Sequence, residues 1–137
     1  MKSAPKTGDQ AELRFVVDHQ HVIDFADDRM PAVLSTPCLI GFLERAARTA
    51  LEPLLEPGES SVGVHIDVQH LAATPPGQQV VCRARVIHVE GRIITFQIEA
   101  FDATERIARG LHKRSIINKD RFAARLRRKS ETAPGRV

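Results

Sequence analysis

Hydrophobic residues recur with a helical period in one stretch near the middle of the chain. Between residues 36 and 51 they stand at positions 39, 40, 42, 43, 46, 47, 50 and 51, so they cover more than one face of the expected helix. Thr36 is expected to cap its start, with Pro37 at the first helical position. Pro53 disfavours helical backbone at the residue before it, so the helix is expected to end near Leu51. A helix that is apolar over most of its surface must be wrapped by other elements.

Other stretches alternate between hydrophobic and polar residues, which is typical of strands with one buried face. In one of them, simple alternation places Val62, Val64, Ile66, Val68 and His70 on the face toward the helix. In the next two, the inward positions are 80, 82, 84 and 86, and then 94, 96, 98 and 100. The inward face of the last strand is ambiguous. The five expected strands cover residues 11 to 17, 62 to 70, 79 to 89, 92 to 101 and 106 to 117.

This order of elements predicts an α+β fold. An antiparallel sheet of about five strands is expected to curl around one long central helix. The 137 residues, 42% of them hydrophobic, are expected to form a single domain. Residues 1 to 10 show no periodicity and are expected to be a mobile arm. Gly110 in the last strand indicates a bulge or a close approach between backbones.

The positive charge of the chain is concentrated at its C-terminal end. Residues 119 to 137 hold seven Lys and Arg against two acidic residues, whereas residues 1 to 118 hold 13 against 15. Residues 119 to 129 can form a short amphipathic helix on Phe122 and Leu126, and the last eight residues are expected to be disordered. With no Trp, no Tyr and six Phe, the chain lacks the aromatic platforms that bind single-stranded nucleic acid, so no nucleic acid partner is expected.

The sequence also bears on the cellular location of the protein and on whether it holds a metal ion. No apolar run approaches the ~18 residues of a membrane span, and the polar start lacks the core of a secretory signal, so a cytoplasmic protein without a membrane partner is expected. Cys38 and Cys82 lie on different expected elements without metal-ligand spacing, so neither a disulfide nor a zinc site is expected. His19 and His21 are interpreted as solvated loop residues rather than metal ligands.

Three polar residues occupy positions that require an explanation. They are Thr36 at the helix start, Glu44 two turns inside the helix, and His70 on the core face of a strand. Each can also be explained by structure alone: Thr36 as a helix cap, Glu44 as a partner for Arg48 at the i,i+4 spacing, and His70 as a core residue with its hydrogen bonds satisfied. Together they provide the hydroxyl, carboxylate and imidazole that acyl transfer requires, and N–H groups at the helix start can stabilise an oxyanion. Cys38 offers a second candidate nucleophile, or a small buried residue.

Four segments carry a resemblance to a known family. They are Val-Leu-Ser-Thr at 33 to 36, Gly-Phe-Leu-Glu at 41 to 44, Leu-Glu-Pro-Gly-Glu at 55 to 59 and His-Leu-Ala-Ala-Thr-Pro-Pro-Gly at 70 to 77. In this order and spacing they resemble the fluoroacetyl-CoA thioesterase-like family of hotdog-fold thioesterases. The resemblance implies a homodimer with sites at the subunit interface and hydrolysis of a short-chain acyl-CoA without a metal or cofactor. It also implies that Thr36, Glu44 and His70 form the catalytic set and that Gly63 lies near the acyl group.

One position departs from that family. Its fluoroacetate-resistance members place an aromatic lid residue just before the proline that corresponds to Pro31, whereas this chain has Met30 there. A methionine changes the shape and stiffness of a lid at the substrate. The acyl group therefore stays open, including selectivity for fluoroacetyl-CoA, and so does the choice between Thr36 and water as the nucleophile.

The charge of the basic tail also predicts a role in substrate binding, because the body is slightly acidic without its surplus of Arg121, Arg125, Arg127, Arg128 and Lys129. Arg121 and Arg125 are expected to bind the nucleotide phosphates of CoA, with solvation of the chain end as the alternative. Two other functions stay open: a non-catalytic acyl-CoA-binding hotdog protein, and a hotdog hydratase or dehydratase. The complete Thr, Glu and His set weighs against the first, and the lack of an Asp/His hydratase motif weighs against the second.

Overall fold

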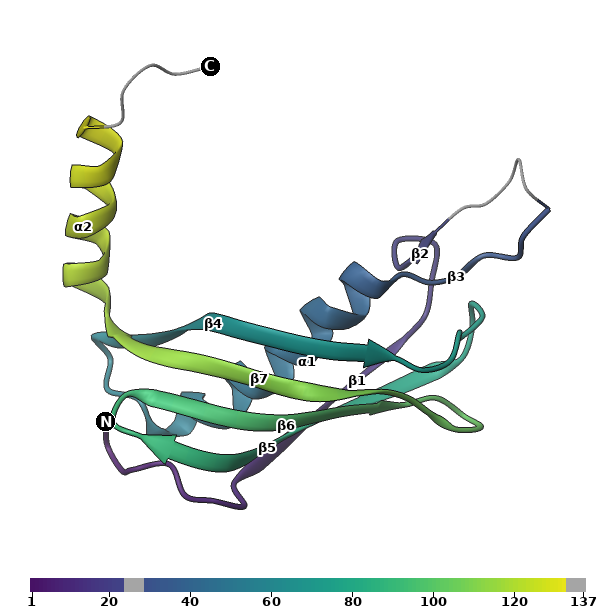
Figure 1. Ribbon diagram of the computed structural model, residues 1–137, viewed down its shortest axis with the longest axis horizontal. Coiled ribbons are helices and arrows are strands. Elements are labelled where there is room, and N and C mark those ends of the chain that lie inside the picture. Colours follow the sequence, from purple (N-terminus) through teal and green to yellow (C-terminus); the bar gives the residue numbers. More distant parts are fainter. Residues whose placement is uncertain (24–28, 133–137) are drawn as a thin grey trace.

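The computed structural model describes residues 1 to 23 and 29 to 132 (Figure 1). None of the helices in these two ranges is long and apolar enough to cross a membrane. A short 3-10 helix, η2 (Glu52–Leu54), follows the central helix. The other elements, in chain order, are β1 (Gln10–Val16), β2 (Val22–Ile23), β3 (Val33–Leu34), α1 (Thr36–Leu51), β4 (Glu59–His70), β5 (Gln79–Glu90), β6 (Ile93–Phe101), β7 (Arg106–Asn118) and α2 (Lys119–Thr132).

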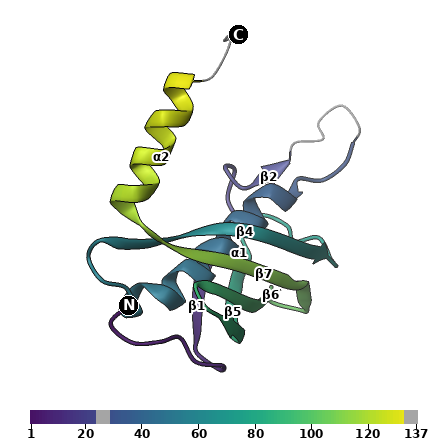
Figure 2. The same cartoon turned by 60° about the vertical axis from the view of Figure 1, so that its left-hand side comes forward.

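One five-stranded antiparallel sheet makes up most of the protein. Its strand order is β1-β5-β6-β7-β4, and the short β2 and β3 pair separately. The sheet curls around α1, which runs along its concave face (Figures 1 and 2). The sequence prediction of an α+β fold with one wrapped helix is confirmed. Since β1 and β4 are the edges of the sheet, each has an outer side that pairs with no other strand of the described chain.

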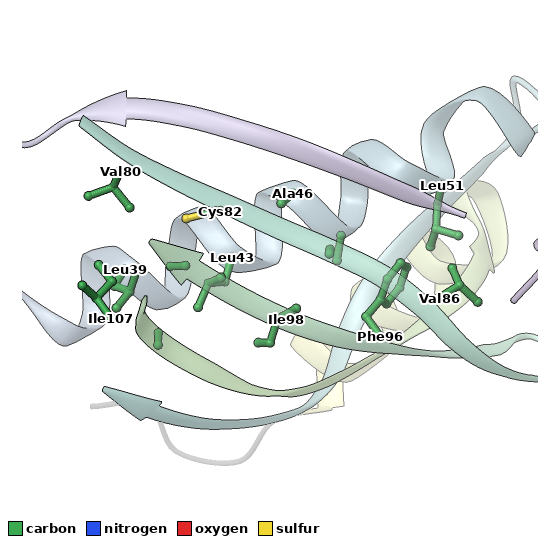
Figure 3. Packing of buried hydrophobic residues seen from close by; sticks show 14 of the residues in the cluster. Leu39, Leu43, Ala46, Leu51, Val80, Cys82, Val86, Phe96, Ile98 and Ile107 are labelled. Carbon is green, nitrogen blue, oxygen red and sulfur yellow. The ribbon is translucent and has the colours of Figure 1, made fainter. Parts of the chain in front are cut away.

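The core lies between α1 and the concave face of the sheet. Leu39, Leu43 and Leu51 of α1 are completely buried against β5 and β6 (Figure 3). The inward positions predicted for these two strands are all completely buried too, so the alternation was interpreted correctly there. They are Val80, Cys82, Ala84 and Val86 on β5, and Ile94, Phe96, Ile98 and Ala100 on β6.

Strand β4 departs from simple alternation. Its pairing with β7 shifts between Gly63 and His65, so Val64 forms a bulge. Gly63 pairs with Arg114 and Ile66 pairs with His112, and these β7 residues share one face. The prediction that His70 and Ile66 share a face is confirmed, but Gly63, rather than Val62, lies on that face with them. The bulge is the physical reason, because it reverses the alternation before it.

Two further expectations from the sequence can be compared with the fold. A Cβ atom on Gly110 would lie 1.9 Å from the backbone oxygen of Asp67, which confirms a close approach between backbones. The N-terminal segment, however, is tied to the body instead of forming a mobile arm. The Lys2 amide donates to the Leu54 carbonyl (2.7 Å), and the terminal amine lies 2.9 Å from Glu59. These contacts explain the difference, since backbone groups and the terminal charge have no hydrophobic periodicity.

Helix α2 extends from the end of β7 and stands away from the sheet (Figures 1 and 2). The amphipathic helix predicted for residues 119 to 129 is confirmed, although it continues to Thr132. It buries none of its residues, and Phe122 and Leu126 are 37% and 50% exposed. The disorder expected for the last eight residues is wrong for 130 to 132, which are helical, and otherwise falls on 133 to 137, outside the described residues.

Candidate active site

Thr36 and His70 meet where α1 begins and β4 ends. The Thr36 hydroxyl oxygen lies 2.8 Å from His70 Nδ1. Thr36 is not the helix cap, contrary to the sequence prediction. Ser35 takes that role with an extended backbone, and its hydroxyl accepts a hydrogen bond from the Cys38 amide (3.3 Å). Because Ser35 satisfies the helix start, the Thr36 hydroxyl is available to His70.

The imidazole of His70 is held in its neutral form. Burial lowers its pKa below the ordinary histidine value, and the backbone of Ala72 opposes part of this lowering. A neutral ring carries one N–H and one acceptor nitrogen. The other ring nitrogen, Nε2, is buried and has no hydrogen-bond partner among the described residues. A buried polar atom of this kind indicates that a further group belongs at this site.

Glu44 lies in a second cluster, with Gly63 and the buried side chain of Arg114. A Glu44 carboxylate oxygen is 3.7 Å from a guanidinium nitrogen of Arg114. A Cβ atom on Gly63 would lie only 2.8 Å from the same carboxylate oxygen, so glycine leaves room for it. The alternative that Glu44 pairs with Arg48 is wrong, because Arg48 faces Glu52 at 3.9 Å. The carboxylate therefore faces a buried cation and a gap above Gly63.

Arg114 is fixed by its own hydrogen bonds. It donates to the hydroxyl and to the backbone carbonyl of Ser61, both at 2.9 Å, and lies 3.2 Å from His112 Nε2. His112 Nδ1 lies 2.8 Å from the carbonyl of His65, so Nδ1 carries the proton and Nε2 accepts from Arg114. Burial lowers the pKa of His112, and the Arg114 cation lowers it further. The neutral His112 ring therefore accepts a hydrogen bond from the Arg114 guanidinium, which also faces Glu44.

The sequence analysis did not identify Ser61, His112 or Arg114. Alternation left the inward face of β7 ambiguous, because Arg114 and His112 are polar residues on the buried side. The available signal was that His112, Arg114 and Ile116 share one parity in the strand. A buried cation needs partners, and these come from β4 and α1, which periodicity within β7 does not reveal.

Within one chain, the two clusters are separate. Thr36 and Glu44 are eight residues apart on α1, which is roughly 12 Å along the helix axis. The structure therefore brings Thr36 to His70, and Glu44 to Gly63 and Arg114, but it does not bring Glu44 to Thr36. The first cluster contains a hydroxyl and a neutral imidazole, and the second contains a carboxylate beside a fixed cation. The first cluster contains the groups that nucleophilic or general-base chemistry requires, and a carboxylate that orients the imidazole would complete the set.

The other residues considered in the sequence analysis lie outside these two clusters. Met30 is 55% exposed, and Arg121 and Arg125 lie on α2, away from Thr36. The Cys38 thiol sulfur is 3.7 Å from the Gln20 carbonyl, and burial raises the pKa of Cys82 to about 12, which makes it a poor nucleophile. His21 is not a solvated loop residue, because its ring packs against Phe15 and Phe42 at 5.3 Å.

Metal ligands do not gather in the described part of the chain. No group of three or more His, Cys, Asp or Glu side chains is arranged there to hold a metal ion. The pair of histidines at 19 and 21 was the candidate raised by sequence spacing. His21 Nδ1 instead accepts a hydrogen bond from the backbone N–H of Asp18 at 3.1 Å.

The sequence of the chain matches that of a known family. The sequence model of the fluoroacetyl-CoA-specific thioesterases matches residues 17 to 120. The chain belongs to this thioesterase family. A fluoroacetyl-CoA thioesterase from Streptantibioticus cattleyicolor is 36% identical over 138 residues, covering 95% of this chain and 98% of that protein. The thioester hydrolase class and the hotdog fold that the sequence motifs indicated are confirmed.

Solved structures agree with the family. A fluoroacetyl-CoA thioesterase structure is similar with a TM-score of 0.84 and 34% identity, covering 93% of this chain and 98% of that one. A thioesterase superfamily member from Thermus thermophilus has a TM-score of 0.85 and 28% identity, with 93% and 95% covered. A hotdog-like protein from Thermanaerovibrio acidaminovorans, 24% identical with a TM-score of 0.81 and 96% of both chains covered, shares the fold.

Proposed function

We propose that this member of the thioesterase family hydrolyses short-chain acyl-CoA, using Thr36 and His70 of one subunit together with Glu44 of a partner subunit. The observation that carries the proposal is the 2.8 Å contact between the Thr36 hydroxyl and a neutral His70 whose Nε2 is buried without a partner in the described chain. Nδ1 is placed to accept the hydroxyl proton, and Nε2–H is left to donate to a carboxylate.

The partner subunit is proposed from the free edge of β4. Val64 and Ile66 of this edge are 53% and 39% exposed, and unpaired strand edges with apolar side chains favour pairing with another chain. Antiparallel pairing of two β4 strands about a twofold axis would place each residue opposite a symmetry-related one. An axis midway between Gly63 and His70 would bring Gly63 of one chain to His70 of the other. Glu44, which lies at Gly63, would then approach the His70 Nε2 of the partner.

The reaction follows from these roles. His70 Nδ1 takes a proton from the Thr36 hydroxyl, or from a water held there, as the oxygen attacks the thioester carbon. The Glu44 carboxylate stabilises the imidazolium that forms. When the carbon–sulfur bond breaks, the imidazolium returns the proton to the leaving CoA thiolate. With Thr36 as the nucleophile, a water molecule then hydrolyses the threonyl ester by the same proton transfers, and the products are CoA and a free acid.

The acyl group is proposed to be short. The Streptantibioticus cattleyicolor relative is a fluoroacetyl-CoA thioesterase, and a solved variant of the fluoroacetyl-CoA-specific enzyme is in complex with fluoroacetate and CoA. Gly63 lines an open cleft of about 320 Å³ beside Glu44, where the acyl group is proposed to bind. Met30 is proposed to cover the acyl group as part of the segment before β3. Its unbranched side chain permits more than one short acyl group.

Release of CoA thiol from a panel of acyl-CoA esters tests the proposal. We expect turnover of at least one ester between acetyl and hexanoyl, in the cytoplasmic pH range, without added metal and in the presence of chelator. His70→Ala should reduce turnover by roughly 10²-fold or more while the fold survives. Absence of turnover across the panel would contradict the enzyme assignment. A His70→Ala protein with a lower thermal midpoint but near-normal turnover would show that His70 is only structural.

A further inference from the structure

Three arginine side chains surround a cleft at the foot of α2. The cleft has a volume of about 470 Å³ and lies at the opposite end of β4 from His70. Arg92 lines it from the turn between β5 and β6, and Arg121 and Arg125 line it from α2. Since Arg121 and Arg125 are one helical turn apart, their side chains project from the same face of the helix.

A neighbouring carboxylate pairs with one of the three arginines of the cleft, Arg92, and leaves the charges of Arg121 and Arg125 uncancelled. Glu59 also lines the cleft, and its carboxylate accepts from the Glu56 amide (3.0 Å) and lies 2.9 Å from the terminal amine and 3.2 Å from Arg92. These contacts, led by the Glu56 amide, lower the pKa of Glu59 to about 2. No carboxylate of the described residues lies within ion-pair distance of Arg121 or Arg125.

The cleft also contains an apolar surface. Phe122, which is 37% exposed, lines it together with Ile117. An exposed aromatic ring offers a stacking surface for a planar base. Guanidinium groups bind phosphate oxygens through paired hydrogen bonds. A ring beside three guanidinium groups therefore matches a ligand with a base and several phosphate groups.

We propose that this cleft binds the nucleotide half of CoA, with the phosphates on Arg92, Arg121 and Arg125 and the adenine against Phe122. This inference rests on the proposed function for the identity of the ligand. Glu59 precedes Gly63 by four residues, roughly 13 Å along β4. A nucleotide in the cleft would thus lie at the Glu44 end of the strand, with the pantetheine arm running along β4 toward Gly63. The site would belong to the subunit that supplies Glu44, not to the one that supplies His70.

Direct binding tests the cleft independently of catalysis. Adenosine 3′,5′-bisphosphate is titrated into the full-length protein by calorimetry at two salt concentrations. We expect binding that weakens as salt is raised, and a loss of roughly tenfold or more in affinity for the double variant Arg121→Ala/Arg125→Ala. The matched control is Arg127→Ala/Arg128→Ala, which removes the same charge from α2 outside the cleft and should lose far less.

Kinetics give a second, separate measurement. The Arg121→Ala/Arg125→Ala protein should show a raised KM for acyl-CoA, with a much smaller change for the matching acyl-pantetheine, which lacks the nucleotide. If the bisphosphate binds but no ester is hydrolysed, the cleft assignment stands and the proposed function fails. If both thioesters are hydrolysed equally well and the bisphosphate does not bind, the function stands and the cleft assignment is wrong.

Two other outcomes would overturn the cleft assignment. Equal losses in the cleft variant and in its matched control would mean that α2 attracts anions only through its overall charge. Conversion of the protein to monomers by Arg121→Ala/Arg125→Ala, measured by light scattering, would mean that this face of α2 contacts a second copy of the chain.

Discussion

Thr36 is available for chemistry because the neighbouring Ser35 caps the helix. Ser35 accepts from the Cys38 amide through its hydroxyl and from the Leu39 amide through its carbonyl (3.0 Å). These contacts occupy the Cys38 and Leu39 N–H groups, so these two amides are not available to stabilise an oxyanion. The Thr36 hydroxyl meets His70 instead, and activity should depend on the charge of that imidazole.

The first prediction concerns pH. Burial lowers the pKa of His70 in one chain, whereas the Glu44 carboxylate proposed to face it in the dimer would favour the charged ring, so kcat/KM should fall on the acid side with a midpoint no higher than about 7. The lowered pKa makes stability depend on pH in the same direction. Protonation favours the unfolded chain, so the free energy of unfolding should decrease as pH falls below about 6.5. A pH profile of kcat/KM measures the midpoint, and an acid limb centred above pH 7 would contradict the assignment.

The second prediction concerns Gly63. A methyl group there would lie 2.8 Å from a Glu44 carboxylate oxygen and 3.2 Å from a His112 ring carbon. Gly63→Ala should displace the flexible carboxylate and reduce kcat/KM roughly tenfold or more, with little change in thermal midpoint. Gly58→Ala, where nothing lies within 4 Å of an added Cβ, is the matched control. Equal kinetics in the two variants would show that the position of Glu44 does not matter.

The sequence predicted which residues belong to the candidate site better than it predicted which residues contact one another. His70 was placed on the core face by alternation, and its contact with Thr36 agrees with that placement. The cap was assigned wrongly because Ser35 and Thr36 are both good capping residues, and only the backbone shows which one leaves the helix. Arg114 was missed because a buried cation is defined by partners on other elements.

Strand β4 determines how the two clusters relate to each other. Its bulge at Val64 puts Gly63 on the same face as His70, which simple alternation did not predict. The alternation of Val62, Val64, Ile66 and Val68 with glycine and polar residues gives no sign of this bulge, because the bulge appears only in the pairing of β4 with β7. By contrast, the inward positions of β5 and β6 were predicted correctly, because their buried residues follow simple alternation in the structure.

The third prediction concerns the edge of β4. A lysine on a strand edge opposes pairing with another strand, because its charge would have to be buried against the partner strand. Val64→Lys should convert the protein to monomers and abolish most thioesterase activity, while circular dichroism stays native. Val16→Lys is the matched control, since Val16 on the other edge strand, β1, is also 53% exposed. Light scattering measures the mass, and a Val64→Lys dimer with normal activity would contradict pairing through β4.

At the scale of the whole molecule, the sequence predicted the wrapped helix but not the edges of the sheet. A helix that is apolar over most of its surface requires a curved sheet, and the structure confirms this. The strand order β1-β5-β6-β7-β4 depends on pairings far apart in the chain, which periodicity does not contain. His70 ends β4 and Glu44 lies beside Gly63 within it, so one chain does not complete the proposed site and a second subunit is needed.

The most direct measurement uses a heterodimer of two inactive variants. His70→Ala and Glu44→Gln chains are co-expressed with different tags, and the mixed dimer is purified through both. If each site takes His70 from one subunit and Glu44 from the other, the mixed dimer has one intact site of two, and CoA release should recover to roughly half of the wild-type rate per dimer. If both residues act within one chain, every site carries a defect, and a mixed dimer as inactive as its two parents would contradict the account.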